Sequence, residues 1–278
     1  MTEGAESGSA ESDGSAPRRR SILFAELTRV DLAHIAPDAL AVVPLGATEQ
    51  HGPHLPTGTD FFHAEWVARE AAARVADLIP VVVTPTLPFG SSEHHFPFGG
   101  TISLPSTVYY DAVTGIVESL VRDGFRHIVL VNGHGGNHEI IQLVARDVAL
   151  RRPVAVAGAS WWNAAWDVMV AAGAHEVGRL PGHAGGFETS LVMAMRPELV
   201  AEPLPDREPT PTPAEYRFPP VFREERHDFW PSIDGFSDGP GLATAEGGQR
   251  WLDVAAAELA RLFVAFYQAP MPEVPAKT

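Results

Sequence analysis

Short apolar runs alternate with amphipathic helical patterns along most of this chain, and that alternation restricts the possible folds more than any other feature of the sequence. Four apolar runs have the length of buried strands: 39–47, 81–89, 127–134 and 154–162. Patterns with helical periodicity fill the intervals between them: 59–78, 107–123 and 138–151. Strands that alternate with helices form a mainly parallel sheet with helices on both faces. The sequence therefore predicts an α/β fold of three layers, α/β/α.

The ends of the chain and one Pro-rich stretch limit the predicted folded region. A chain of 278 residues can form one large α/β domain or two small ones. Residues 1–20 begin with a Gly/Ser/Glu-rich stretch that can bury little, so we predict a disordered tail there and a second tail at 271–278. A final amphipathic helix at 243–267 would pack back on the core, which favours a single domain over 21–270. The Pro-rich stretch 202–220 is interpreted as an extended loop or as an arm that contacts a neighbouring subunit.

The composition excludes several classes of function. The formal net charge of −15 would repel a phosphate backbone, so we predict no nucleic-acid partner. The longest apolar runs are far shorter than the roughly 20 residues that span a bilayer, which predicts no membrane segment and a cytoplasmic location. The chain has no Cys, which excludes thiol nucleophiles and thiolate metal sites. Any metal ion would have to be held by His, Asp and Glu.

Polar, Gly-rich segments follow the predicted strands. Four of them contain several potential ligands or catalytic side chains: 46–60, 91–105, 132–137 and 182–190. The first three come at or after the ends of predicted strands, and the fourth opens a further helix. In an open parallel sheet, ligands bind beyond the carboxyl ends of the strands. These segments therefore predict a shared site at one edge of the sheet.

The segment 46–60 carries the densest set of metal-binding side chains. Glu49 and His51 are two residues apart, so their side chains point the same way in an extended chain. Asp60 begins a predicted helix, where it could be an N-cap or could reach back over the loop as a ligand. Capping would not explain Glu49 and His51, and we therefore favour the interpretation as ligands. His54 could hydrogen-bond within the loop or contact the metal.

The sequence "NGHGGN" places His134 at the end of a predicted strand. A Gly-rich turn before a helix can bind phosphate, but this spacing matches neither the dinucleotide fingerprint nor the P-loop. The turn could simply expose His134, although its position at the same edge as Glu49 favours a ligand. In "GHAGGFETS", Glu188 could either complement a helix dipole or bind the metal, and His183 lies in the turn before it.

Taken together, the four segments resemble the creatininase (creatinine amidohydrolase) family over roughly residues 38–200. The matching patterns are E-x-H-G-x-H-L-P-x-x-x-D, the stretch around "EHHFPFGGTISL", N-G-H-G-G-N and H-A-G-x-x-E-T-S. The resemblance implies an α/β fold, two divalent metal ions per chain and hydrolysis of C–N bonds other than ordinary peptide bonds. It also implies a homo-oligomer, commonly a hexamer.

The resemblance also implies roles for individual residues. His183 matches the histidine that transfers a proton at the substrate, and Asp60 matches the carboxylate that bridges both ions. The implied metal ligands are Glu49, His51, Asp60, His134 and, as the candidate for the remaining position, Glu188. Imidazoles and carboxylates suit Zn, Mn or Fe, and the sequence does not distinguish among these metals.

Two departures from the family pattern bear on the substrate. Gly136 stands where creatininase proper has a Glu, and Arg179 stands where it has a Trp beside the substrate ring. Both departures argue against creatinine itself. A related branch with N-G-H-G-G-N includes the peptidase that trims the mycofactocin precursor and a formamide hydrolase of flavin and deazaflavin synthesis. The candidate substrate contacts are Glu93, His94, Trp162 and Arg179.

These observations predict a dinuclear metal-dependent amidohydrolase that cleaves an amide, lactam or formamide bond of a small molecule. One alternative is a peptidase of the mycofactocin type, acting on a short peptide. A second alternative, from another class, is a metal-binding or sensor protein without catalytic activity. A structural metal site needs no open position and no proton carrier nearby, which favours the enzyme.

Overall fold

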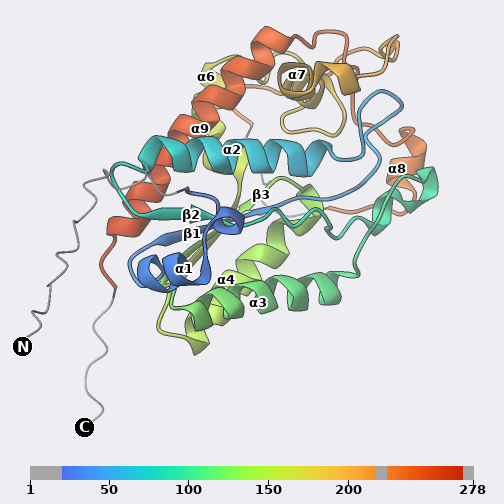
Figure 1. Cartoon of the computed structure of the whole chain (residues 1–278). Coiled ribbons are helices and arrows are strands. Elements are labelled where there is room, and N and C mark those ends of the chain that lie inside the picture. The colour runs from blue at the N-terminus through green and yellow to red at the C-terminus, as the bar shows by residue number, and fades with distance from the viewer. Residues whose placement is uncertain (1–20, 217–223, 272–278) are drawn as a thin grey trace, which may run out of the picture.

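In the computed structural model, which describes residues 21–216 and 224–271, four parallel strands form the central sheet. The strands are β1 (Leu40–Leu45), β2 (Val81–Val83), β3 (His127–Asn132) and β4 (Ala155–Ser160). They lie in the order β2-β1-β3-β4, and each neighbouring pair is parallel (Figure 1). The predicted parallel sheet is confirmed.

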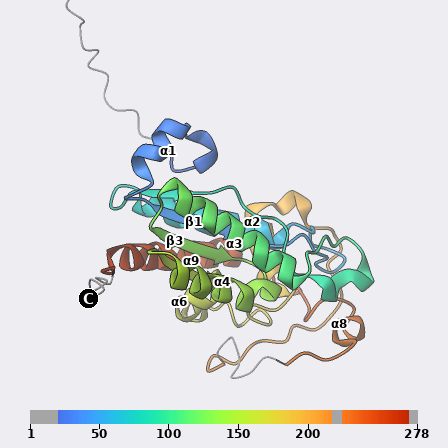
Figure 2. The ribbon, with the colours of Figure 1, turned by 90° about the horizontal axis from the view of Figure 1, so that it is seen from below.

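Side chains of β1 alternate between two apolar cores, which makes the three layers. Leu40 and Val42 pack with α2 (Thr59–Val75) and α9 (Ala245–Gln268) on one face of the sheet. The neighbouring side chains, Ala41 and Val43, pack on the other face with α3 (Ser106–Asp123) and α4 (His138–Arg151). Figures 1 and 2 show the two helical layers on opposite sides of the strands. This alternation follows from the period of two in a β-strand, and the predicted α/β/α architecture is confirmed.

The other helices range from the long α3 and α4 to single turns. The α-helices are α1 (Arg29–Ile35), α3 (Ser106–Asp123), α4 (His138–Arg151), α5 (Trp161–Ala164), α6 (Trp166–Ala171), α7 (Gly186–Met195) and α8 (Phe229–Ser232). The 3-10 turns are η1 (Phe24–Glu26), η2 (Glu93–Phe98), η3 (Gly135–Asn137) and η4 (Pro197–Leu199).

All four predicted strands are shorter in the structure, including those at 39–47 and 127–134, which are observed as β1 and β3. The predicted strand at 81–89 ends at Val83, since Pro85 and Pro88 have no N–H to donate to a ladder. The predicted strand at 154–162 ends at Ser160, and Trp161 already begins α5. At both places the strand gives way to a loop or a helix earlier than predicted, near the edge of the sheet where the polar segments lie.

The predicted Pro-rich loop is extended where the structure describes it. Residues 202–216 contain no helix or strand and hydrogen-bond to their own chain. The Gly239 N–H donates to the Glu208 carbonyl over 3.2 Å, and the Leu180 N–H donates to Thr212 Oγ1 over 2.9 Å. The predicted tail at 1–20 and residues 272–278 lie outside the described residues, as do 217–220 of the loop, and the single domain over 21–270 stays a prediction. Within the described parts of the chain, no helix is both long and apolar enough to cross a bilayer.

Candidate metal centre

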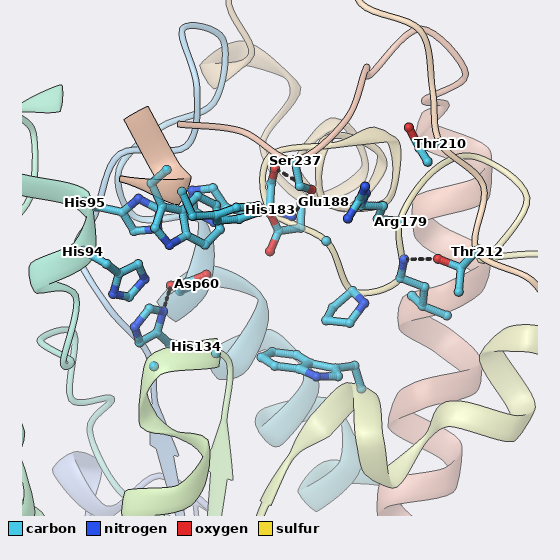
Figure 3. Close-up of a pocket in the computed structure, with 18 of the residues that line it drawn as sticks. Asp60, His94, His95, His134, Arg179, His183, Glu188, Thr210, Thr212 and Ser237 are labelled. Atoms are coloured by element: carbon cyan, nitrogen blue, oxygen red, sulfur yellow. Dashed lines mark hydrogen bonds and ion pairs between the residues drawn. The ribbon is translucent and has the colours of Figure 1, made fainter. Parts of the chain in front are cut away.

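A cavity of about 680 Å³ opens beyond the carboxyl ends of β1 and β3. All four polar segments reach it, as the sequence predicted. Its inner wall carries a cluster of titratable side chains (Figure 3): Glu49, Asp60, His94, His95, His134, His183 and Glu188. These residues come from the loop after β1, the first turn of α2, η2, the turn after β3, and the loop and first turn of α7.

Asp60 lies at the middle of this cluster and faces two histidines. Its Oδ1 is 3.2 Å from His51 Nε2, and its Oδ2 is 2.9 Å from His134 Nδ1. The N-cap of α2 is Gly58, and no side-chain cap is formed there, so the alternative interpretation of Asp60 as an N-cap is wrong. The two carboxylate oxygens therefore point toward ligands from two different segments of the chain.

Glu49 and Glu188 lie on different sides of Asp60. Glu49 Oε1 is 3.3 Å from His134 Nδ1 and 3.6 Å from His183 Nδ1. Glu188 Oε2 is 3.7 Å from His51 Nε2 and accepts a hydrogen bond of 2.6 Å from the Ala184 N–H. The other oxygen of Glu49, Oε2, is buried with no hydrogen-bond partner among the described residues. A buried carboxylate oxygen without a donor is costly unless a cation binds it.

Three histidines of the cluster are each oriented by a backbone carbonyl. His51 Nδ1 lies 3.1 Å from the Glu49 carbonyl oxygen, and His134 Nε2 lies 3.0 Å from the Ser91 carbonyl oxygen. In His183 it is Nε2 that lies 2.9 Å from the Gln50 carbonyl oxygen. A carbonyl can only accept, so in each ring that nitrogen carries the proton. The opposite nitrogen of each ring faces the carboxylates, which is the orientation a metal ligand or a proton acceptor needs.

Opposite charges within the cluster outweigh the effect of burial. Burial raises the pKa of Glu49, but the charges of His134 and His95 and the hydrogen bond with His134 together outweigh burial and lower this pKa to about 2. Burial lowers the pKa of His51, but Asp60 and Glu188 together raise it to about 10. The pKa of His134 is likewise raised, against burial, by Glu49 and Asp60. Without metal, two imidazolium cations thus neutralise the carboxylates.

The pKa values of Glu188 and His183 shift in the opposite sense: that of the carboxylate is raised and that of the histidine is lowered. Burial raises the pKa of Glu188 to about 8. Burial, followed by the charge of His51, holds the pKa of His183 well below its usual range. His183 is therefore neutral while its Nδ1 faces Glu49, so this nitrogen can accept a proton.

The structure brings most of the predicted site residues together. Three groups of side chains have ligand atoms within 4.8 Å of one another and could hold a metal ion: Glu49 with His94 and His134, Glu49 with His51 and His183, and His51 with Asp60 and Glu188. Trp162 and Arg179, two of the candidate substrate contacts, line the cavity. Glu93 is exposed and does not line the cavity, so this predicted contact is not brought to the site. His54 Nε2 forms a hydrogen bond of 2.9 Å with Thr189 Oγ1, and His54 belongs to none of these three groups.

Two side chains of the site, His95 and Trp230, are not among the candidate substrate contacts predicted from the sequence. His95 is buried, with Nε2 3.4 Å from Glu49 Oε1 and its ring centroid 4.3 Å from that of His183. Trp230, in α8, lies with its ring centroid 4.5 Å from that of His95. The doubled histidine at 94–95 was a signal that could have found His95. No local pattern marks Trp230, which reaches the site only through the path of the chain after the Pro-rich loop.

Comparison with known proteins links this geometry to one family. Residues 25–263 match the profile of the creatininase family, described as creatinine amidohydrolase. The mycofactocin precursor peptide peptidase of Mycobacterium tuberculosis is 36% identical over 165 residues, or 56% of this chain and 58% of that protein. The creatinine amidohydrolase of Pseudomonas putida is 33% identical over 200 residues, or 65% of this chain and 74% of that protein. The match thus spans little more than half the length of the mycobacterial relative.

Solved structures resemble the fold more completely. A mutant creatininase complexed with creatine has a TM-score of 0.73 and 28% identity, covering 90% of this chain and all of that one. A creatininase of Zn–Zn type and a Mn creatininase match with the same TM-score of 0.73, at 28% and 29% identity and 90% of this chain. The likeness to these structures therefore extends over nine tenths of this chain.

Proposed function

Because this chain belongs to the creatininase family of hydrolases, we propose that it is a dinuclear metal-dependent amidohydrolase acting on a C–N bond of a small molecule. The proposed bond is an amide, a lactam or a formamide. The proposed ligands are Glu49, His51, Asp60, His134 and Glu188, and the proposed ions are Zn, Mn or Fe. Solved relatives in Zn–Zn and Mn forms support the first two of these metals.

The position of Asp60 is the observation that carries this proposal. One of its oxygens faces His51 at 3.2 Å and the other faces His134 at 2.9 Å. Glu188 lies on the side of His51, and Glu49 on the side of His134. A carboxylate with a separate ligand group at each oxygen has the arrangement that bridging two cations requires. The unpartnered oxygen of Glu49 supplies a further donor.

The residues of the chain have separate chemical tasks in this proposal. When bound, two divalent ions lower the pKa of a shared water and polarise the scissile carbonyl. His183, neutral and oriented by the Gln50 carbonyl, takes up a proton at Nδ1 and passes it to the leaving nitrogen. His95 and Trp230 pack against the His183 ring and restrict how it can turn.

The size of the cavity favours a substrate larger than creatinine. Its volume of about 680 Å³ falls within the roughly 300–1,000 Å³ of pockets that hold drug-sized ligands. A peptidase of the mycofactocin type is the second candidate, supported by the 36% identity to that peptidase and by the open cavity. Both candidates use the same metal centre and differ only in what occupies the outer cavity.

A substrate panel tests the proposed function. Protein purified without chelator would be analysed for metal and then assayed on lactams, formamides and short peptides. We expect about two divalent ions per chain, and hydrolysis that a chelator abolishes and Zn or Mn restores. Cleavage of peptides alone would favour the second candidate. Absence of bound metal would contradict the proposed function in both forms.

We also propose a homo-oligomer, a hexamer by family resemblance, and a cytoplasmic location. In this proposal the Pro-rich loop contributes to the subunit contact while its residues 207–212 stay bound to their own chain. Light scattering of the purified protein at micromolar concentration measures the mass directly. A monomeric mass would contradict the oligomer without affecting the metal centre.

A further inference from the structure

His94 lies beside the metal centre but has no role in the function proposed above. A ring nitrogen of His94 lies within 4.8 Å of the ligand atoms of Glu49 and His134. Its ring is stacked on the ring of His134, with centroids 5.9 Å apart and planes inclined by 7°. Figure 3 shows the two rings next to each other at one side of Asp60. The sequence had suggested His94 as a substrate contact.

The local backbone holds His94 at this place. The Ser92 N–H donates to Ser103 Oγ over 2.7 Å, and the His95 N–H donates to the Ser92 carbonyl over 3.0 Å, which closes the 3-10 turn. The His94 ring also contacts Trp230, with centroids 5.5 Å apart. Because His94 is only partly buried, the ring retains room to adjust toward a bound ion.

The turn after β3 cannot supply a ligand from Gly136. A Cβ at this position would overlap the Ser91 carbonyl oxygen and approach His134 Nε2. That carbonyl is the group that orients His134. The backbone there is therefore packed too tightly for a side chain, so a further ligand beside Glu49 and His134 would have to come from another segment of the chain.

We propose that His94 is a third ligand of the ion held by Glu49 and His134. This inference rests on the proposed dinuclear centre and makes its two positions chemically different. The first position then has two imidazoles and the Glu49 carboxylate, together with the shared Asp60. The second has one imidazole, from His51, and the carboxylates of Asp60 and Glu188.

The difference in ligands assigns a metal preference to each position. Imidazole nitrogen favours Zn and similar transition metals, whereas carboxylate oxygen also suits Mn. The position with His94 and His134 should therefore select Zn over Mn. The position with Asp60 and Glu188 should accept either ion. A chain offered both metals would then hold a mixed pair.

Metal titration of His94→Ala tests this assignment. Zn affinities would be measured by competition with a chromophoric chelator, and His34→Ala, an exposed histidine on α1, is the matched control. We expect His94→Ala to weaken one of two Zn sites by at least about tenfold and to leave the other unchanged. His34→Ala should match the wild type. His94→Gln, which keeps a polar side chain of similar reach, should also weaken the one site.

Two further readouts separate a ligand from a substrate contact. In the Co²⁺-substituted protein, loss of an imidazole ligand should change the visible absorption of one ion before any substrate is added. Protein loaded from an equimolar Zn and Mn mixture should contain more Mn in His94→Ala than in the wild type. Unchanged Zn affinities and an unchanged Co²⁺ spectrum in His94→Ala would overturn the inference. If the wild-type protein itself does not bind divalent ions tightly, the proposed function is overturned instead.

Discussion

Asp60 is a single side chain on which both proposed metal positions depend. Replacing it with Asn keeps the shape and one oxygen but removes the negative charge that faces His51 and His134. We expect Asp60→Asn to fold, to bind less metal and to lose at least about a hundredfold in activity, the upper end of what losing an outer-shell partner costs. Elemental analysis and steady-state rates measure both effects. Normal metal content and activity would show that Asp60 is not a bridging ligand.

His183 differs from the ligands because its pKa keeps it neutral. We expect His183→Ala to retain both ions and to lose about 10²–10⁴-fold in turnover, the usual contribution of general acid–base catalysis. The loss should be largest for substrates with basic leaving amines and small for activated anilides, which need no proton. Rates for a series of leaving groups provide the measurement. An equal loss across the series, or a loss of metal, would assign His183 to another role.

At the residue scale, the sequence predicted which side chains gather at the cavity better than it predicted their surroundings. Glu49, His51 and His134 could be predicted as candidate ligands, because ordinary loops seldom place several metal-binding side chains just after strands. The carbonyl groups that orient the histidines could not be predicted, because Ser91 and Gln50 act through their backbone. Glu93 illustrates the reverse error, since adjacent residues in a 3-10 turn point in different directions.

At the scale of elements, the long helices were predicted well because each has a sustained apolar face. The predicted helices at 107–123 and 138–151 agree with α3 and α4 to within one residue. The strands were predicted too long. The run that includes Val83 continues to residue 89 in the sequence, but its prolines cannot extend the strand. The α8 helix was missed because four residues carry no measurable periodicity.

The turn between β3 and α4 depends on close packing against α2. A Cβ at Gly133 would overlap the Asp60 carbonyl and come within 2.8 Å of the Ala64 Cβ. We expect Gly133→Ala to lower the free energy of unfolding by about 1–3 kcal/mol, as overpacking does, and to reduce metal binding by moving Asp60. Urea unfolding and metal analysis measure the two effects.

Gly115 is the matched control for this substitution. It lies inside α3, and a Cβ there would have open space. Gly115→Ala should therefore raise the free energy of unfolding by about 0.5–1 kcal/mol, because Ala favours a helix interior over Gly. Opposite signs for the two substitutions would support the close contact of the turn with α2. Equal effects would contradict it.

At the scale of the whole molecule, two cores on either side of one sheet leave the polar cluster at the sheet's edge. The layers could be predicted because strand and helix periodicities are local properties. The shape of the outer cavity could not, because its wall combines Arg179, Thr212 and Trp230, which are far apart in the sequence. The family could therefore be predicted from the sequence, whereas the substrate depends on the assembled wall.

The pH dependence of stability should differ between metal-free and metal-bound protein. The pKa of His51 is raised from 6.5 to about 10, and that of Glu188 from 4.5 to about 8. A raised pKa stabilises the folded chain fully below the unfolded value and loses that effect as pH rises through the folded value. Above about pH 6.5 the metal-free protein should therefore lose stability as these protons leave, up to about pH 8 for Glu188 and up to about pH 10 for His51.

Bound metal should reverse this trend, since divalent ions replace the protons of His51 and Glu188 and bind more tightly as these groups deprotonate. Metal that binds only the folded chain raises the melting temperature. We therefore expect the rise in melting temperature on adding Zn to be larger at pH 8 than at pH 6. Calorimetry of chelator-treated and Zn-loaded protein at both values makes the measurement, and Asp60→Asn serves as the control with a weakened site. A rise that is equal at the two pH values, or larger at pH 6, would mean that the ions do not displace these protons.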